Sequence, residues 1–399
     1  MKLTQRIVLL AVAVVCGSFL SGCGETVVGV TKGEIKIGTW APLTGPATHL
    51  GVSAKAVEAY FKYINEEEGG VHGRKLTLIT KDDAYDPTRT PEVVTELVEQ
   101  DQVFAIVGGH GTANCLAVKD YLALEMIPWI NPGSGSRVWA IPVQAYVFSI
   151  YPSYVTEARA LAEYAVKELG ADRVGMMYQD DSFGREGQEG ALLALGRLDK
   201  ELLISVPYSV GETDFSAKAK ELRDKVLDTV MLWGIPSHVA PLLEEIKKNN
   251  DTVKFRSMEF HPKLLGSGVL ADPAMWDAAG ELWEGAIVAS GVPNPDSDEP
   301  GVVRAREIMS KYAPGVPFGS YALMGLVRAE LLVEGIKRAG PSINRIRLIL
   351  ALESLEEWSD NFLGQPITIN KDNHQGFDSV QLMKIEGGKH VSVTGWVKP

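Results

Sequence analysis

The chain has 399 residues, of which 45% are hydrophobic and 23% are charged, and its formal net charge is −12. These fractions are typical of a folded globular protein and exclude disordered and fibrous classes, while the length predicts two or three domains. The acidic balance argues against nucleic acid or an anionic membrane as a partner. With three cysteines, a disulfide framework is excluded.

The first 22 residues have the pattern of a signal peptide. Two basic residues precede an apolar run over 7–20, which is shorter than the ~20 residues that span a bilayer. The run ends in Leu20-Ser21-Gly22-Cys23, which resembles the lipobox of bacterial lipoproteins. We therefore expect lipidation at Cys23, a flexible tether over 23–33, and an extracytoplasmic mature protein, in the periplasm or on the outer face of the cell membrane. Plain secretion with cleavage among small residues is the alternative.

From residue 34 on, short β-rich runs alternate with amphipathic stretches. The first part predicts strands over 35–40, 75–81, 103–107 and 127–130, and helices over 51–67, 90–100 and 113–126. The pattern then restarts, with strands over 173–178, 202–206 and 229–233, and helices over 154–169, 185–198, 214–225 and 237–249. Helices over 302–312, 319–338 and 342–354 follow, and short strands after Gly364 finish the chain. Such alternation predicts parallel sheets covered on both faces.

Two loop-rich seams, 146–152 and 291–301, divide this pattern. We predict an α/β protein of two doubly wound parallel-sheet lobes, joined by about three crossover strands, with a ligand cleft between them. Lobe one is expected to contain residues 34–150 and 286–363, and lobe two residues 151–285 and 364–399. Because ligands of such sheets bind at the carboxyl ends of strands, the residues that follow strands are the candidates for a site.

Two neighbouring loops at strand ends in lobe one are rich in glycine and hydroxyl groups. The first loop, 108–112, has three glycines that let a ligand approach the backbone, and Thr112 with the helix N-terminus offers a carboxylate site. Thr112 capping its own helix is an equal alternative, and His110 is expected to be a turn residue. The second loop, 131–136, could supply further donors to the same carboxylate.

Lobe two offers fewer candidates. Residues 178–184 and 233–235 follow predicted strands, and Glu259 follows the run 253–257 among apolar neighbours. A carboxylate in such surroundings suits an ammonium group, although the residues alone favour a surface acid. Trp40, at the end of the first strand, is either a cleft or a core aromatic.

Enzyme signatures are absent from the sequence. It has no GxSxG elbow, P-loop, HExxH or strand-linked GxGxxG motif, and no His or Cys cluster with metal spacing. Cys115 and His110 lack an orienting third group, so we expect Cys115 in a helix core. The prediction is a binding protein without catalytic residues, metal or cofactor.

Several sequence segments, in order over residues 34–290, resemble one family, the branched-chain amino-acid (Leu/Ile/Val-binding) type of ABC-transporter solute-binding protein. That family has the type I periplasmic-binding fold. These segments are residues 41–46 with Gly51, 64–76, 82–87, 106–108, 131–133, 165–170, 181–184 and 211–216. Each alone is weak, but their joint order is specific. The C-terminal third resembles the family more loosely.

The resemblance implies roles for particular residues. Thr112 falls where the family places a hydroxyl on the ligand carboxylate, and Glu259 falls on the acid that holds the α-ammonium group in amino-acid binders. The remaining expected ligand-binding residues are backbone donors and pocket-lining side chains: Gly133, Ser134, Gly135, Leu50, Trp40, Phe183, Trp233 and Ile235.

The resemblance also implies a function. The two lobes would close on a hydrophobic amino acid, first of all a branched-chain one, and the closed monomer would deliver it to a membrane permease driven by cytoplasmic ATPases. Some members carry a disulfide where this chain has Tyr85 and Gly111, and tyrosines where it has Phe183 and Ile235. Aromatic or aliphatic carboxylates and small amides of the urea type therefore remain alternative ligands. A ligand-sensing receptor module remains an alternative function.

Overall fold

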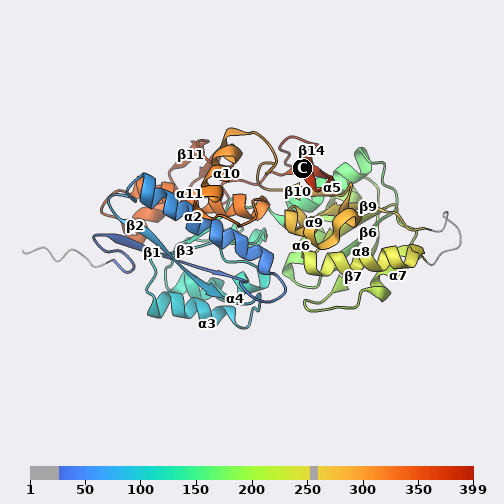
Figure 1. Ribbon diagram of the computed structural model, residues 1–399, viewed down its shortest axis with the longest axis horizontal. Coiled ribbons are helices and arrows are strands. Elements are labelled where there is room, and N and C mark those ends of the chain that lie inside the picture. The colour runs from blue at the N-terminus through green and yellow to red at the C-terminus, as the bar shows by residue number, and fades with distance from the viewer. Residues whose placement is uncertain (1–26, 252–258) are drawn as a thin grey trace, which may run out of the picture.

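The computed structural model describes residues 27–251 and 259–399. The predicted signal peptide and Cys23 lie outside the described residues, as does the run 253–257. Two lobes lie side by side along the long axis of the molecule (Figure 1). None of the described helices is long and apolar enough to cross a membrane.

Lobe one is built on a parallel five-stranded sheet of order β2-β1-β3-β4-β5. Its strands are β1 (Glu34–Ala41), β2 (Lys75–Asp82), β3 (Ala105–Val107), β4 (Trp129–Ile130) and β5 (Val147–Phe148). Its longer helices are α2 (Val52–Glu67), α3 (Thr90–Thr95), α4 (Thr112–Leu124), α10 (Pro300–Tyr312), α11 (Ser320–Ala339) and α12 (Arg345–Leu352). Short helical turns are η1 (Thr48–Gly51), η2 (Glu96–Gln100) and η3 (Arg137–Trp139), and β11 (Leu355–Trp358) pairs with β12 (Ile367–Ile369).

Lobe two is built on a seven-stranded sheet of order β14-β13-β10-β9-β8-β6-β7. Its strands are β6 (Val174–Gln179), β7 (Leu202–Tyr208), β8 (Thr229–Trp233), β9 (Lys263–Gly266), β10 (Ile287–Ser290), β13 (Gln381–Glu386) and β14 (Lys389–Ser392), the last two antiparallel. Its helices and helical turns are α5 (Tyr154–Lys167), α6 (Ser182–Arg197), α7 (Ser216–Asp224), α8 (Pro236–Asp251), η5 (Gly268–Leu270), α9 (Pro273–Ala279) and η6 (Gly280–Trp283).

Helix α11 is the central helix of lobe one. Sixteen of its 20 residues are buried, because it packs between α2 and α12 and over the sheet. Gly325 makes the close crossing possible, since a side chain there would overlap the backbone of Ser53 on α2. This helix also brings Arg328 to the carboxyl end of β3, where a Cβ on Gly108 would lie 2.7 Å from the guanidinium Nη1.

The predicted fold class is confirmed, and the alternation of strands and helices is observed in the predicted order. In the described residues the chain passes between the lobes three times: after β5, after β10 and after β12. Two predicted boundaries need correction. Residues 287–290 pair with β9 and β13 and belong to lobe two, whereas residues 367–369 pair with β11 in lobe one. A short apolar strand has the same residue pattern in either sheet, so the sequence does not show which strand it pairs with.

Candidate functional site

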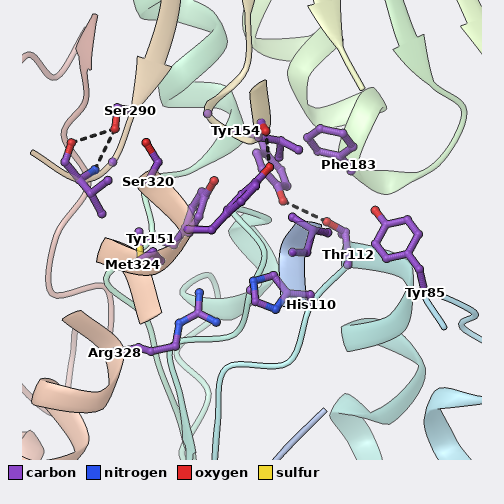
Figure 2. A pocket seen from close by; sticks show the side chains of 18 residues that line it. Tyr85, His110, Thr112, Tyr151, Tyr154, Phe183, Ser290, Ser320, Met324 and Arg328 are labelled. Carbon is purple, nitrogen blue, oxygen red and sulfur yellow. Dashed lines mark hydrogen bonds between the residues drawn. The ribbon is translucent and has the colours of Figure 1, made fainter. Parts of the chain in front are cut away.

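A pocket lies between the two lobes, at the carboxyl ends of their strands. The wall from lobe one is formed by η1, by the loops after β2, β3 and β4, and by the first half of α11. The wall from lobe two is formed by the starts of α5 and α6, by η5, and by the loop after β10 (Figure 2). The side chains that line it are Leu50, Tyr85, His110, Thr112, Tyr151, Tyr154, Phe183, Val269, Ser290, Val292, Ser320, Tyr321, Met324 and Arg328. Four glycines complete the lining: Gly111, Gly133, Gly268 and Gly291.

A cluster of three hydroxyl groups joins the two lobes at one side of this pocket. The Thr112 hydroxyl lies 2.9 Å from the Ser134 hydroxyl and donates to Tyr154 Oη at 3.3 Å. Gly111, with φ of 94°, is the N-cap residue of α4, so Thr112 is the first helical residue and makes no side-chain cap. The alternative that Thr112 caps its own helix is therefore wrong. Its hydroxyl faces the neighbouring loop and the other lobe.

The apolar side of the pocket is formed by aromatic and aliphatic side chains from both lobes. Leu50, Tyr85 and Tyr321 form a buried cluster with Ile235, and Phe183 packs edge-on against Tyr154 with ring centroids 4.8 Å apart. The Tyr85 ring occupies the space beside Gly111, where a Cβ would lie 2.9 Å from it. An aromatic contact thus stands where some family members have a disulfide. The pocket suits a ligand with an apolar body.

One cation lines the pocket. Arg328 is 1% exposed, and none of the hydrogen bonds or ion pairs of the described residues involves its guanidinium. Burial lowers the pKa of Arg328 to about 10, so the group is still charged at neutral pH. Beside it, burial and the Arg328 charge hold the pKa of His110 well below its usual range, and His110 Nδ1 also lacks a partner.

A buried carboxyl group, Glu157, lies next to the pocket on the first turn of α5. It is fully buried, and its Oε2 accepts the Gly268 N–H at 2.9 Å, while its Oε1 has no partner. Burial raises the pKa of Glu157 to about 8, so the group is mostly protonated at neutral pH. It lies behind the pocket wall, because a Cβ on Gly268 would be 3.0 Å from Oε1 and 3.3 Å from the Tyr151 hydroxyl.

Glu259 does not line this pocket, which corrects the expectation from the sequence. It precedes β9, at the opposite end of the strand from the cleft residues Gly268 and Val269, and it lines a different hollow with α8 and η6. There its carboxylate lies 2.8 Å from the His261 ring. The expectation came from the resemblance to the family, whereas the residues alone had favoured a surface acid; the strand of this sheet that follows Glu259 is β9 (Lys263–Gly266).

The other predicted site residues divide into three groups. Leu50, Thr112, Gly133 and Phe183 line the pocket. Ser134, Gly135 and Ile235 lie directly behind its wall, through contacts with Thr112, Tyr154 and Tyr321. Trp40 and Trp233 are core residues: Trp40 packs on Trp129 and Trp233 packs on Phe183, and neither lines the pocket.

Sequence reasoning missed most of the wall that α11 and the crossover segments contribute. Tyr151 lies in the predicted seam, whereas Tyr154, Tyr321 and Arg328 lie on helices that were predicted correctly as elements. The one available signal was Arg328 itself, a charge within the apolar stretch of a helix that is buried on nearly all sides. Cys115 is buried in the lobe-one core, as expected.

The pocket has the components of a binding site. Hydroxyl groups, one unpaired cation and aromatic walls can hold and orient a small molecule. Among residues 27–251 and 259–399, no group of three or more His, Cys, Asp or Glu side chains is arranged to hold a metal ion.

Comparison with known proteins agrees with this arrangement. Residues 34–389 match the periplasmic binding protein family. The chain belongs to this family. A curated relative, Leu/Ile/Val-binding protein homolog 3 of Brucella melitensis, is 23% identical over 375 residues, which cover 90% of this chain and 94% of the relative.

Solved structures with the same fold belong to proteins that are named for different ligands. The fatty acid ABC transporter substrate-binding protein from Thermomonospora curvata has a TM-score of 0.84 at 22% identity, covering 94% of this chain and 95% of that one. A branched-chain amino acid ABC transporter protein from Thermus thermophilus, with bound valine, has a TM-score of 0.79 at 23% identity. The match covers 92% of this chain and 97% of that one. At these identities the likeness shows the fold alone.

Proposed function

We propose that this protein is the extracytoplasmic solute-binding component of an ABC importer and that it captures a small hydrophobic carboxylate between its lobes. The observation that supports this most is the pocket itself, in which an unpaired buried arginine and a hydroxyl cluster face aromatic and aliphatic side chains. The match to the periplasmic binding protein family supports the transport role.

Capture would work by closure of the lobes without chemistry. Thr112 and Gly133 hold the ligand from lobe one, while Tyr154, Phe183 and Val269 cover it from lobe two. Closure requires contacts that exist only in the closed state, because a ligand shifts a conformational equilibrium by its differential affinity for the two states. The Thr112–Tyr154 hydrogen bond, which links the lobes, is one such contact.

Two ligand classes fit this proposal. A branched-chain or other hydrophobic amino acid is the class that the sequence favours, and an amine-free aromatic or aliphatic acid is the second. The position of Glu259 outside the pocket favours the second class, because the expected partner of an α-ammonium group is absent from the lining. The named ligands of the neighbours, a fatty acid and valine, include one of each class.

A thermal-shift panel on the purified protein tests the function. It compares leucine, isoleucine and valine with benzoate, medium-chain fatty acids, and urea-like amides. A ligand at 1,000 times its Kd adds about 4 kcal/mol, which raises Tm by about 8–16 °C for lobes of this size. We expect such a shift with at least one carboxylate. A shift with amides alone would contradict carboxylate capture.

We also propose that lipid on Cys23 anchors the protein to a membrane after cleavage of residues 1–22. Radiolabelled palmitate should enter the wild-type chain expressed in bacteria and should not enter the Cys23→Ser variant. Equal labelling of both chains would contradict this anchor.

A further inference from the structure

We propose that Arg328 pairs with the ligand carboxylate and makes the pocket select acids that carry no ammonium group. This inference rests on the proposed function and names the residue that decides its substrate class. It starts from the position of a single charged group on α11.

The Arg328 guanidinium has no hydrogen-bond or ion-pair partner among the residues that the structure describes. It is 1% exposed and lies against Gly108, close to His110 and Tyr151. Figure 2 shows it pointing from α11 toward the space between these two side chains. A buried cation without an anion or a set of hydrogen-bond acceptors is strongly destabilising. The burial of Arg328 is therefore explained if the guanidinium pairs with an anion that comes from outside the protein.

A carboxylate is the anion that suits this position. The planar guanidinium offers several N–H donors that match the two oxygens of a carboxylate. The Thr112 and Ser134 hydroxyls lie at the same end of the lobe-one sheet, on the loops after β3 and β4. The aromatic side chains Tyr85, Phe183 and Tyr321 would cover the rest of a small acid.

The charge balance of the pocket disfavours an ammonium group. Among residues 27–251 and 259–399, Arg328 is the only Arg, Lys, Asp or Glu side chain that lines it. An amino acid would place a second cation beside Arg328 without a carboxylate in the lining. Glu157, a buried carboxyl next to the pocket, lies behind Gly268, and burial keeps it mostly protonated at neutral pH. A ligand with net charge −1 would neutralise the pocket.

The test uses probes that share one isobutyl skeleton: 4-methylpentanoate, its α-amino derivative leucine, and the uncharged 4-methylpentanamide. Benzoate and acetate extend the set to an aromatic acid and to a short aliphatic acid. Affinities are measured by calorimetry at matched ionic strength for wild type, Arg328→Met, Arg328→Lys and Glu157→Gln. Arg338→Met is the matched control, because Arg338 lies on the same helix, is 36% exposed and pairs with Glu334.

We expect the wild type to bind an amine-free acid more tightly than leucine or the amide. Arg328→Met should weaken acid binding on the order of 100-fold, since a buried charge pair loses one partner, and Arg328→Lys should weaken it less. Arg338→Met and Glu157→Gln should leave acid binding unchanged. Thermal unfolding of each variant shows that it is folded.

Three results would overturn the inference. Unchanged acid binding by folded Arg328→Met would remove Arg328 from recognition and leave the proposed function intact. Tighter binding of leucine than of 4-methylpentanoate, abolished in Glu157→Gln, would assign the site to amino acids, also within the proposed function. No binding of any carboxylate by the wild type would contradict the proposed function together with the inference.

Discussion

Two buried polar regions on opposite sides of α11 differ in how their charged groups are satisfied. On the outer side, Glu330 accepts from the Arg304 guanidinium and from the Phe362 N–H, both at 2.6 Å, one on each carboxylate oxygen. On the pocket side, two residues earlier, Arg328 has no hydrogen-bond or ion-pair partner in the described part of the chain. Glu157, across the cleft, is intermediate, with one oxygen bonded and the other without a partner.

This difference separates the groups that hold the fold from those available to a ligand. The Glu330 contacts connect α11 with α10 and with the segment before β12, three parts of lobe one that are distant in sequence. Arg328 connects nothing, although it is more deeply buried than Arg304. We therefore expect substitutions at these three positions to affect the stability of the unliganded protein in the order Glu330, Glu157, Arg328.

The largest effect is expected for Glu330→Leu. The substitution leaves the Phe362 N–H buried without an acceptor and removes the partner of Arg304, so the free energy of unfolding should fall by about 3 kcal/mol. Because Arg304 is 43% exposed and can turn to water, the Phe362 N–H should account for most of the loss. Urea unfolding of wild type and variant measures this difference. A loss of stability below about 0.5 kcal/mol would show that the Glu330 contacts do not hold the segment before β12 in place.

An intermediate effect is expected at Glu157, and it should depend on pH. The folded protein releases this proton near pH 8 and the unfolded chain near pH 4.5. Between these values the folded state holds more protons, so the free energy of unfolding falls as pH rises, by up to about 1.4 kcal/mol per unit. Glu157→Gln removes the titration and keeps the acceptor for Gly268.

Unfolding at pH 5, 6.5 and 8 tests this prediction. Relative to Glu157→Gln, the wild type should lose stability as pH rises over this range. Burial also raises the pKa of Glu330 to about 8, but Glu330 is present in both proteins, so their difference isolates Glu157. Parallel stability curves for the two proteins would contradict the raised pKa.

The sequence predicted what depends on periodicity and local turn chemistry. The order of strands and helices, the two lobes and the glycine-rich loops after β3 and β4 follow from hydrophobic alternation and from residues that tolerate positive φ. Thr112 and Gly133 were placed correctly because they follow strands directly, and the edge of a parallel sheet gathers such residues.

The sequence did not predict contacts set by packing between distant elements. Glu259 was misplaced because the resemblance to the family assigned it to the ligand, whereas the fold puts it before β9, at the end of the strand away from the cleft. The Arg328 role depends on the crossing of α11 over Gly108, which no periodicity reveals. Tyr151 and Tyr154 lie where the chain changes lobes, so their neighbours depend on how the lobes meet.

The smallest effect on the unliganded protein is expected for Arg328→Met. Removing a buried charge that has no partner relieves its desolvation, while methionine fills a similar volume among Met324 and Tyr151. The free energy of unfolding should stay within about 1 kcal/mol of wild type or rise above it, as measured in urea without any added carboxylate. Addition of a bound acid should reverse the order, because only the wild type gains the full binding energy. A loss in the unliganded protein as large as that of Glu330→Leu would mean that Arg328 holds the fold, and the contrast between the two sides of α11 would fail.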